Sequence, residues 1–209
     1  MDRKDFISKT PYVYHLTNKD NLDFIVSQGK LFSTVMLAEM ALGIQAAGDF
    51  LRTRRNDHTL LQLNGVAVSI RDQQPITRAL DRCLTDNWTR EDFIYFLNQR
   101  VFTWPNLKRL NIHFSRYEAE SPIILRLPTD ELLRINQDPL LTNLNSGATR
   151  CIPKYRGAPP RGKNTFKLIE EYPGTPGSVA EVTFLQKCIL PKMIEIGSHP
   201  VGPWERLQL

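Results

Sequence analysis

Residues 14–33 read YHLTNKDNLDFIVSQGKLFS, and this stretch decides how the chain begins to fold. Residues from Tyr12 to Leu16 have the character of a short β-strand. Asp20 can cap a helix that continues to about Gln28, and Gly29 is a typical residue just after a helix C-terminus. The stretch therefore predicts a strand that is followed closely by a helix.

The end of this strand carries polar side chains that can bind a ligand. His15 and Thr17 alternate onto the same face of the strand. An imidazole and a hydroxyl on one face can hydrogen-bond a ribose diol or an amide. The alternative interpretation is a core histidine that is satisfied by the backbone, and the sequence leaves both open.

The rest of the chain alternates helix and strand patterns without a regular βαβ rhythm. Thr89 and Asp92 resemble a capping box for a helix at Arg90–Asn98. Other helices are expected near residues 34–42, 45–55, 75–84, 105–114 and 129–135, and strands near 66–70, 101–103, 122–127, 150–153, 179–184 and 188–196. The mixture predicts an α+β fold with a split, mainly antiparallel sheet and flanking helices.

Length and composition favour one soluble domain over residues 1–209. Hydrophobic residues make up 41% of the chain, which supplies a sizeable core. We expect no membrane partner, since no apolar run approaches the ~18–20 residues that a membrane span needs. The N-terminal segment lacks the features of a secretory signal. Cys83, Cys151 and Cys188 fit neither a disulfide framework nor a zinc cluster, so a reducing, cytoplasmic location is expected.

The chain is mildly basic, with a formal net charge of +5. One cluster of positive charge is at residues 52–55. A second lies between Arg150 and Lys167, where no acidic residue occurs. Such clusters can contact phosphates, or they can be solvated surface.

Several short motifs resemble the DarT-type ADP-ribosyltransferases. His15-Leu16-Thr17 is similar to the His-[Ile/Leu]-Thr strand of that family. In that family a helix with a spaced Asn-Leu…Ile…Gly-Leu pattern follows the strand. Here Asn21-Leu22, Ile25, Gly29 and Leu31 match this pattern, although Lys30 stands where the family tends to have an apolar residue. The likeness to a related family of uncharacterised bacterial domains is closer still, over residues 70–73, 98–104, 145–149 and 161–166.

The resemblance implies NAD as co-substrate and Glu181 as the catalytic acid. The family places a catalytic glutamate on a late strand, where this chain has Ala180-Glu181-Val182. A carboxylate near the reacting ribose can hold a hydroxyl and stabilise positive charge, and it can accept a proton from the acceptor. The alternative is a Glu181 that lies on the solvent face of an edge strand.

Other residues are also expected to contact NAD or its reacting centre. Arg71 follows the strand at 66–70, and a guanidinium there suits the NAD pyrophosphate or the reacting centre. Its alternative is a salt bridge with a nearby acid. Gln73 can bond an amide or a base, and Trp104 can stack on a ring or anchor the core. The expected cofactor-binding residues are His15, Leu16, Thr17, Asn21, Gln73 and Trp104.

The polar and basic segment ahead of Glu181 is expected to choose the acceptor, as the corresponding loop does in ADP-ribosyltransferases. The expected substrate-binding residues are Asn145, Ser146, Thr149, Arg156, Arg161 and Lys163. Positive charge there suits a nucleic acid, whose affinity comes mainly from its phosphates. DarT-type enzymes modify single-stranded DNA, which agrees with a nucleic-acid partner.

The resulting hypothesis is an NAD-dependent mono-ADP-ribosyltransferase that modifies a nucleic-acid base. The resemblance further implies a bacterial toxin or phage-defence effector with an antitoxin partner. Two other functions remain open at this point: a non-catalytic module that binds NAD, ADP-ribose or nucleic acid, and an NAD glycohydrolase. No metal site is expected, because the histidines and cysteines lack metal-ligand spacing.

Overall fold

The fold is α+β, as the sequence predicts, in a computed structural model that describes residues 1–149 and 159–209. Two four-stranded sheets form the centre, and all pairings between the named strands are antiparallel. The first sheet has the order β1 (Tyr12–Thr17), β6 (Ile123–Pro128), β11 (Met193–Gly197), β12 (Glu205–Gln208). The second has the order β5 (Arg100–Thr103), β9 (Glu181–Leu185), β7 (Leu140–Thr142), β8 (Lys167–Leu168).

The two sheets meet at one backbone bridge between β1 and Trp104, the residue that follows β5. Tyr14 and Trp104 each donate a backbone N–H to the other's carbonyl at 2.8 Å. Beside this bridge, the carbonyl of Phe102 is bonded by the side chain of His15 instead of by the backbone of β1. The two strands therefore pair at one point only, which leaves the sheets split where His15 lies.

Two smaller sheets flank this junction. β2 (Lys30–Phe32) pairs with β10 (Lys187–Ile189). β3 (Thr59–Leu63) and β4 (Val66–Ile70) form a hairpin around Asn64 and Gly65. The φ angles of these two residues are 52° and 84°. Both values are positive, as an Asn-Gly turn of type I′ requires. The sequence patterns did not predict β2 or β3.

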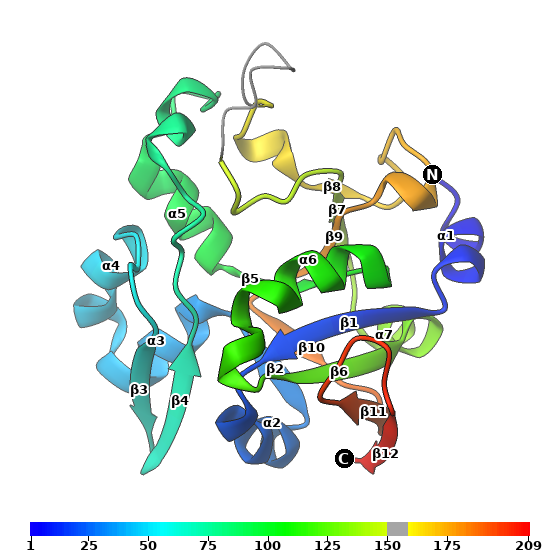
Figure 1. The fold of residues 1–209 in the computed structure, drawn as a ribbon. Coiled ribbons are helices and arrows are strands. Elements are labelled where there is room, and N and C mark those ends of the chain that lie inside the picture. The colour runs from blue at the N-terminus through cyan, green and yellow to red at the C-terminus, as the bar shows by residue number, and fades with distance from the viewer. Residues whose placement is uncertain (150–158) are drawn as a thin grey trace.

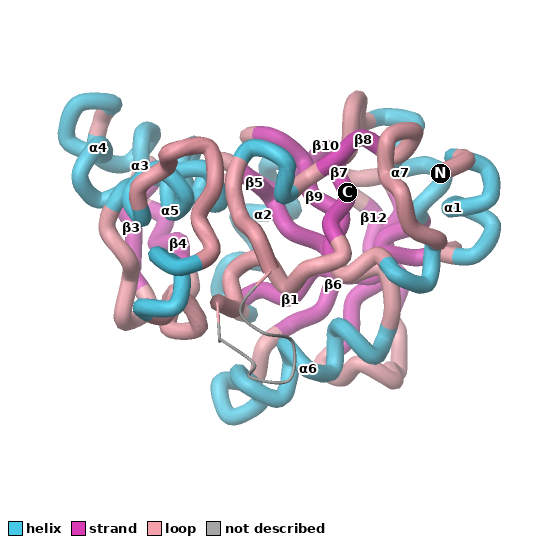
Figure 2. Tube along the Cα trace, turned by 90° about the horizontal axis from the view of Figure 1, so that it is seen from above, coloured by secondary structure: helices cyan, strands magenta, loops and turns pink. Residues whose placement is uncertain are grey.

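Helices cover both faces of β1, whose side chains alternate between two core clusters. Val13 packs with Phe6 of α1 and the β6 residues Leu125 and Leu127. Tyr14 and Leu16 pack on the other face with α6, which lies across β1 in Figure 1. The helices are α1 (Arg3–Lys9), α2 (Leu22–Gln28), α3 (Thr34–Leu42), α4 (Ile44–Arg52), α5 (Arg90–Asn98), α6 (Leu107–Tyr117) and α7 (Thr129–Ile135). Figure 2 shows α3, α4 and the β3–β4 hairpin at one end of the molecule and α1 at the other.

Two of the expected helix ends are confirmed, but Asp20 does not cap α2, because Asn18 caps a 3-10 turn at Lys19–Asn21 that precedes the helix. Thr89 and Asp92 form the reciprocal capping box that begins α5, and Gly29 ends α2 with a left-handed φ of 58°. The helix expected over residues 75–84 is wrong, because only a 3-10 turn at Arg78–Arg82 forms there. Thr77 has an extended backbone and caps this turn, its hydroxyl accepting from the backbone N–H of Ala79, so no helix runs through it from Pro75. The strand expected at residues 150–153 lies outside the described residues.

Candidate functional site

A cavity of about 310 Å³ opens at the split between the two sheets. That volume lies at the lower end of the range for small-molecule sites. The ends of β1, β4, β5 and β9 contribute to its wall, together with one side of α6. Ten of the residues predicted for the site line it: His15, Leu16, Thr17, Asn21, Arg71, Gln73, Trp104, Asn145, Ser146 and Glu181.

Glu181 begins β9 and is buried, with only 4% of its surface exposed. The alternative of a solvent-facing acid is therefore wrong. Burial raises the pKa of its carboxyl to about 7, and two hydrogen bonds from Ser146 oppose that rise. The Ser146 backbone N–H donates to one carboxylate oxygen at 3.2 Å, and its hydroxyl donates to the other at 2.7 Å. A carboxyl with a pKa near 7 can both accept and release a proton at neutral pH.

Arg161 holds the loop that carries Ser146. Its guanidinium donates to the carbonyls of Ser146 at 3.1 Å and Ala148 at 2.8 Å. It also donates to the carbonyls of Asn145 and Pro159. Arg161 is 3% exposed and does not line the cavity. This placement corrects the expected contact with the acceptor, because the guanidinium is used inside the protein.

Two other residues expected to bind the acceptor, Thr149 and Lys163, do not line the cavity either. Thr149 is buried and bonds Thr77. Lys163 is on the surface, 3.6 Å from Asp86. Arg156 lies outside the described residues. Of the predicted acceptor residues, only Asn145 and Ser146 are among the described residues that line the cavity.

His15 is a neutral hydrogen-bond acceptor toward the cavity. Its Nδ1 lies 2.8 Å from the carbonyl oxygen of Phe102. That oxygen can only accept, so Nδ1 carries the proton. Burial lowers the pKa of His15 to about 4, against the effect of this hydrogen bond. The unprotonated Nε2 is left to accept a hydrogen bond from a hydroxyl or an amide. The interpretation of His15 as satisfied by the backbone is therefore right for Nδ1. For Nε2, the ligand-binding interpretation stays open.

Two predicted ligand contacts use their side-chain amides within the protein. Asn21 donates to the Thr17 hydroxyl at 3.1 Å and exchanges two hydrogen bonds with the backbone of Ser69. It therefore fastens the β3–β4 hairpin, which leads to Arg71. Gln73 donates to Asn98 at 3.1 Å and accepts from the backbone N–H of Arg55 at 3.2 Å.

Arg71 has a buried guanidinium that lies against an aromatic ring. It lies over the ring of Tyr117, with its Cζ 3.9 Å from the ring centroid. It forms an ion pair with Glu120 at 3.6 Å, and none of its three side-chain nitrogens makes a hydrogen bond in the described structure. Burial lowers its pKa below the ordinary value of an arginine. The salt bridge considered as the alternative is therefore present, with Glu120 as the acid, and its 3.6 Å separation is longer than a hydrogen bond.

The cavity also contains functional groups that the sequence reasoning ranked too low. Arg55 donates to the carbonyl of Arg71 and to Asn98, and it lines the cavity beside them. His113 stacks on Trp104 with ring centroids 4.2 Å apart, and burial lowers its pKa to about 3. Among its described lining residues, the cavity has five cations, Lys30, Arg55, Arg71, Arg100 and Arg116, and two acids, Asp72 and Glu181.

These features define an α+β protein with a cationic cavity and a buried carboxyl at the junction of two antiparallel sheets. Residues 11–190 match a family described as "Family of unknown function (DUF7002)", and the chain belongs to this family. No curated protein and no solved structure matches the chain. Within residues 1–149 and 159–209, no helix is long and apolar enough to cross a membrane, and no group of histidine, cysteine and acidic residues forms a metal site.

Proposed function

We propose that this protein is an NAD-dependent mono-ADP-ribosyltransferase that modifies a nucleic-acid base. One observation carries the proposal: His15 and Glu181, far apart in the sequence, line the same cavity. There the carboxyl of Glu181 is held by two hydrogen bonds from Ser146, and His15 has one acceptor nitrogen without a hydrogen bond from the described residues. This is the pair of groups that the DarT-like motifs lead one to expect at the ends of an NAD site.

The charge of the cavity fits the dinucleotide. NAD carries two negative charges on its pyrophosphate, and cations outnumber acids among the described residues of the cavity wall. Arg71 is the strongest point of this fit, since its buried nitrogens lack hydrogen-bond acceptors within the described residues. Guanidinium nitrogens pair well with phosphate oxygens. We therefore assign the pyrophosphate to Arg71, with Arg55 as a second cation beside it.

The chemistry required of the protein is modest. When bound, NAD supplies an ADP-ribosyl group whose C1′ gains positive charge as nicotinamide departs. The ionised Glu181 carboxylate stabilises that charge and accepts a hydrogen bond from a ribose hydroxyl. The bond from C1′ to nicotinamide breaks, and a bond from C1′ to a nucleophilic atom of the base forms. The proton lost by the base passes to Glu181, and nicotinamide leaves as a neutral molecule.

Turnover in the presence of candidate acceptors tests the proposal. The protein is incubated with NAD labelled in its adenylate half, together with single-stranded DNA, RNA or a protein mixture. We expect nicotinamide release with label on the DNA or RNA, and loss of both by about 100-fold or more in Glu181→Gln. The matched control is Glu131→Gln, on the exposed side of α7, which should keep wild-type turnover.

The other results separate the rival functions. Nicotinamide release without a labelled acceptor would identify an NAD glycohydrolase. NAD binding without release would identify a non-catalytic module. Label on protein alone would overturn the nucleic-acid part of the proposal. A toxin that acts on nucleic acid would need an inhibitor in the cell that makes it, so an antitoxin partner belongs to the same proposal.

A further inference from the structure

We infer that the side of α6 bordering the cavity binds the backbone of a single-stranded nucleic acid. Arg109, Ile112, His113 and Arg116 follow the spacing i, i+3, i+4, i+7 and so share one side of the helix. The inference rests on the proposed function, because it names the surface that would present the acceptor to Glu181. It also replaces Arg161, which is buried, as the expected contact for acceptor phosphates.

The charges on this helix are positive, and none of them is paired within the described residues. Residues 105–117 contain no aspartate or glutamate. Lys108, Arg109 and Arg116 make no salt bridge and no side-chain hydrogen bond in the part of the chain that the structure describes. Arginines elsewhere, such as Arg126, do pair with acids. A helix that keeps these cations at the edge of a cavity is suited to a polyanion.

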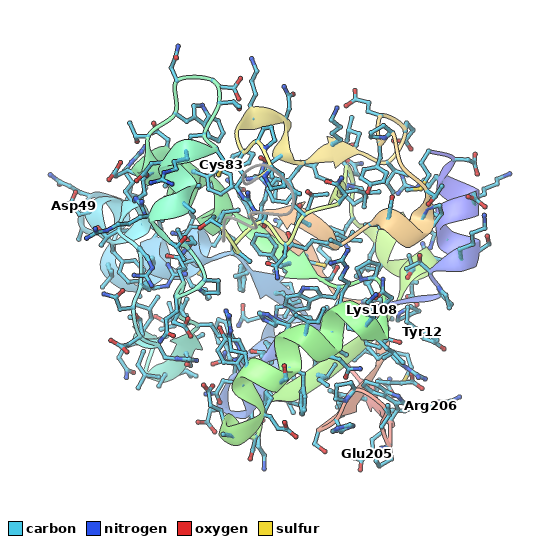
Figure 3. All side chains as sticks on the ribbon, turned by 45° about the horizontal axis from the view of Figure 1, so that its top comes forward. Tyr12, Asp49, Cys83, Lys108, Glu205 and Arg206 are labelled. Carbon is cyan, nitrogen blue, oxygen red and sulfur yellow. The ribbon has the colours of Figure 1, made fainter. Side chains whose placement is uncertain are left out.

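A strand bound along this side of α6 would pass the cavity. Ile112, His113 and Arg116 line its wall. Arg109 lies one turn before His113 on the same side of α6, and its positive charge contributes to lowering the pKa of Glu181. Figure 3 labels Lys108 on α6, one residue before Arg109. Arg109 and Arg116 are two turns apart, roughly 10 Å along the helix axis, so they can hold phosphates on either side of one base.

An apolar side chain stands between these two cations. Ile112 is 56% exposed, although isoleucine is among the residues most often buried. Cations that alternate with apolar contacts are typical of surfaces that hold single strands, where phosphates and base faces are bound together. A base inside a duplex cannot reach a buried carboxyl unless it leaves its stack. These features favour a single strand over a duplex.

Oligonucleotide binding without NAD tests the inference. The probe is a fluorescent single-stranded oligonucleotide of mixed sequence, as DNA and as RNA, titrated between roughly 50 and 200 mM salt. The variant Arg109→Gln/Arg116→Gln removes two cations. Loss of two phosphate contacts should reduce the slope of log affinity against log salt by about 1.4. The matched control Arg134→Gln/Arg206→Gln removes the same charge from other elements and should keep the wild-type slope.

A further variant separates docking from general electrostatic attraction. Ile112→Glu places an acid between the two arginines at an exposed site, so the fold should persist. It should weaken oligonucleotide binding by about 10-fold or more. Equal slopes for the α6 variant and its control, or tighter binding of an acidic peptide than of the oligonucleotide, would overturn the inference. Because this binding assay contains no NAD, its result does not depend on turnover. Failure of the protein to consume NAD would overturn the proposed function but would leave the binding result unchanged.

Discussion

Ser146 donates both its backbone N–H and its hydroxyl to the carboxyl of Glu181, one to each oxygen. Both residues are buried, with exposed fractions of 0% and 4%. The two hydrogen bonds fix the orientation of the carboxyl and favour its ionised form. Its pKa of about 7 is the balance between burial, which raises the value, and these hydrogen bonds, which lower it.

Ser146→Ala should move this balance. The change removes the hydroxyl donor and leaves the backbone N–H in place. A hydrogen bond to a charged group contributes roughly 1.5–3 kcal/mol, so the pKa of Glu181 should rise by about 1–2 units. The rising limb of the pH–turnover profile should shift upward by the same amount. Ser27→Ala, on α2, removes a surface hydroxyl and is the control. An unchanged midpoint would show that Ser146 does not set the ionisation of Glu181.

Arg161→Gln should weaken both the fold and the site. The arginine donates hydrogen bonds to four carbonyls, three of them in the segment that carries Ser146, and most of these would be left without donors. Unsatisfied buried groups cost roughly 1–3 kcal/mol each, and partial relaxation brings the expected loss to about 2–4 kcal/mol. Urea denaturation measures it. The control is Lys163→Gln, two residues away but on the surface. It should change the free energy of unfolding by less, about 0.5 kcal/mol at most.

Arg161 and Lys163 have similar sequence contexts, but only Arg161 is buried. Both stand in the basic segment before Glu181, and the pattern of charge gives them the same expected role. What differs is the fold around them. The backbone N–H of Arg161 is bonded to the carbonyl of Cys83, so a segment far away in the sequence draws this side chain inside.

Local sequence patterns therefore predict helices, strands and turns better than they predict which distant residues come into contact. The α5 capping box and the end of α2 at Gly29 depend on neighbouring residues, and both are confirmed. Of the β3–β4 hairpin, only β4 was predicted, although Asn64-Gly65 between apolar residues indicates a hairpin turn. The meeting of His15 and Glu181 in one cavity depends on the pairing of β1 with β5 and of β5 with β9, which no local pattern encodes. The same holds for the α6 residues, which reach the cavity only when α6 packs on β1.

Arg71→Gln should separate ligand binding from stability. Its guanidinium lies over Tyr117 without hydrogen bonds in the described structure. Burial of this charge opposes the benefit of the ring contact and of the long ion pair with Glu120, so the free energy of unfolding should change by only about 1 kcal/mol or less. The affinity for NAD should fall by about 10- to 100-fold, because hydrogen bonds to a charged group are lost. Isothermal titration with NAD measures this.

The control for Arg71 is Arg126→Gln. Arg126 is similarly buried, but it pairs with Glu195 and lies against Tyr12 and Trp204, on the outer part of the first sheet. It should lose stability and keep its NAD affinity. The reverse pattern, with Arg71→Gln unfolding and NAD affinity intact, would make Arg71 a structural cation.

The stability of Glu181→Gln should depend on pH in a defined direction. The folded-state pKa of about 7 is above the ordinary value of 4.5, so the folded protein binds the proton more tightly than the unfolded chain. This preference is fully present below the ordinary pKa and is lost as pH rises through the folded-state value. A glutamine mimics the protonated carboxyl at every pH. Its advantage over the wild type should therefore grow by roughly 2–3 kcal/mol between about pH 5 and pH 8.

Urea denaturation of both proteins at the two pH values measures this difference, and Glu131→Gln on α7 provides a surface comparison. An advantage of Glu181→Gln that is the same at both pH values would mean that burial does not hold the proton. Activity supplies the second half of the argument. If ionised Glu181 stabilises the reacting ribose, wild-type turnover should rise with pH over the same interval in which stability falls. The charge that weakens the fold would then be the charge that the reaction uses.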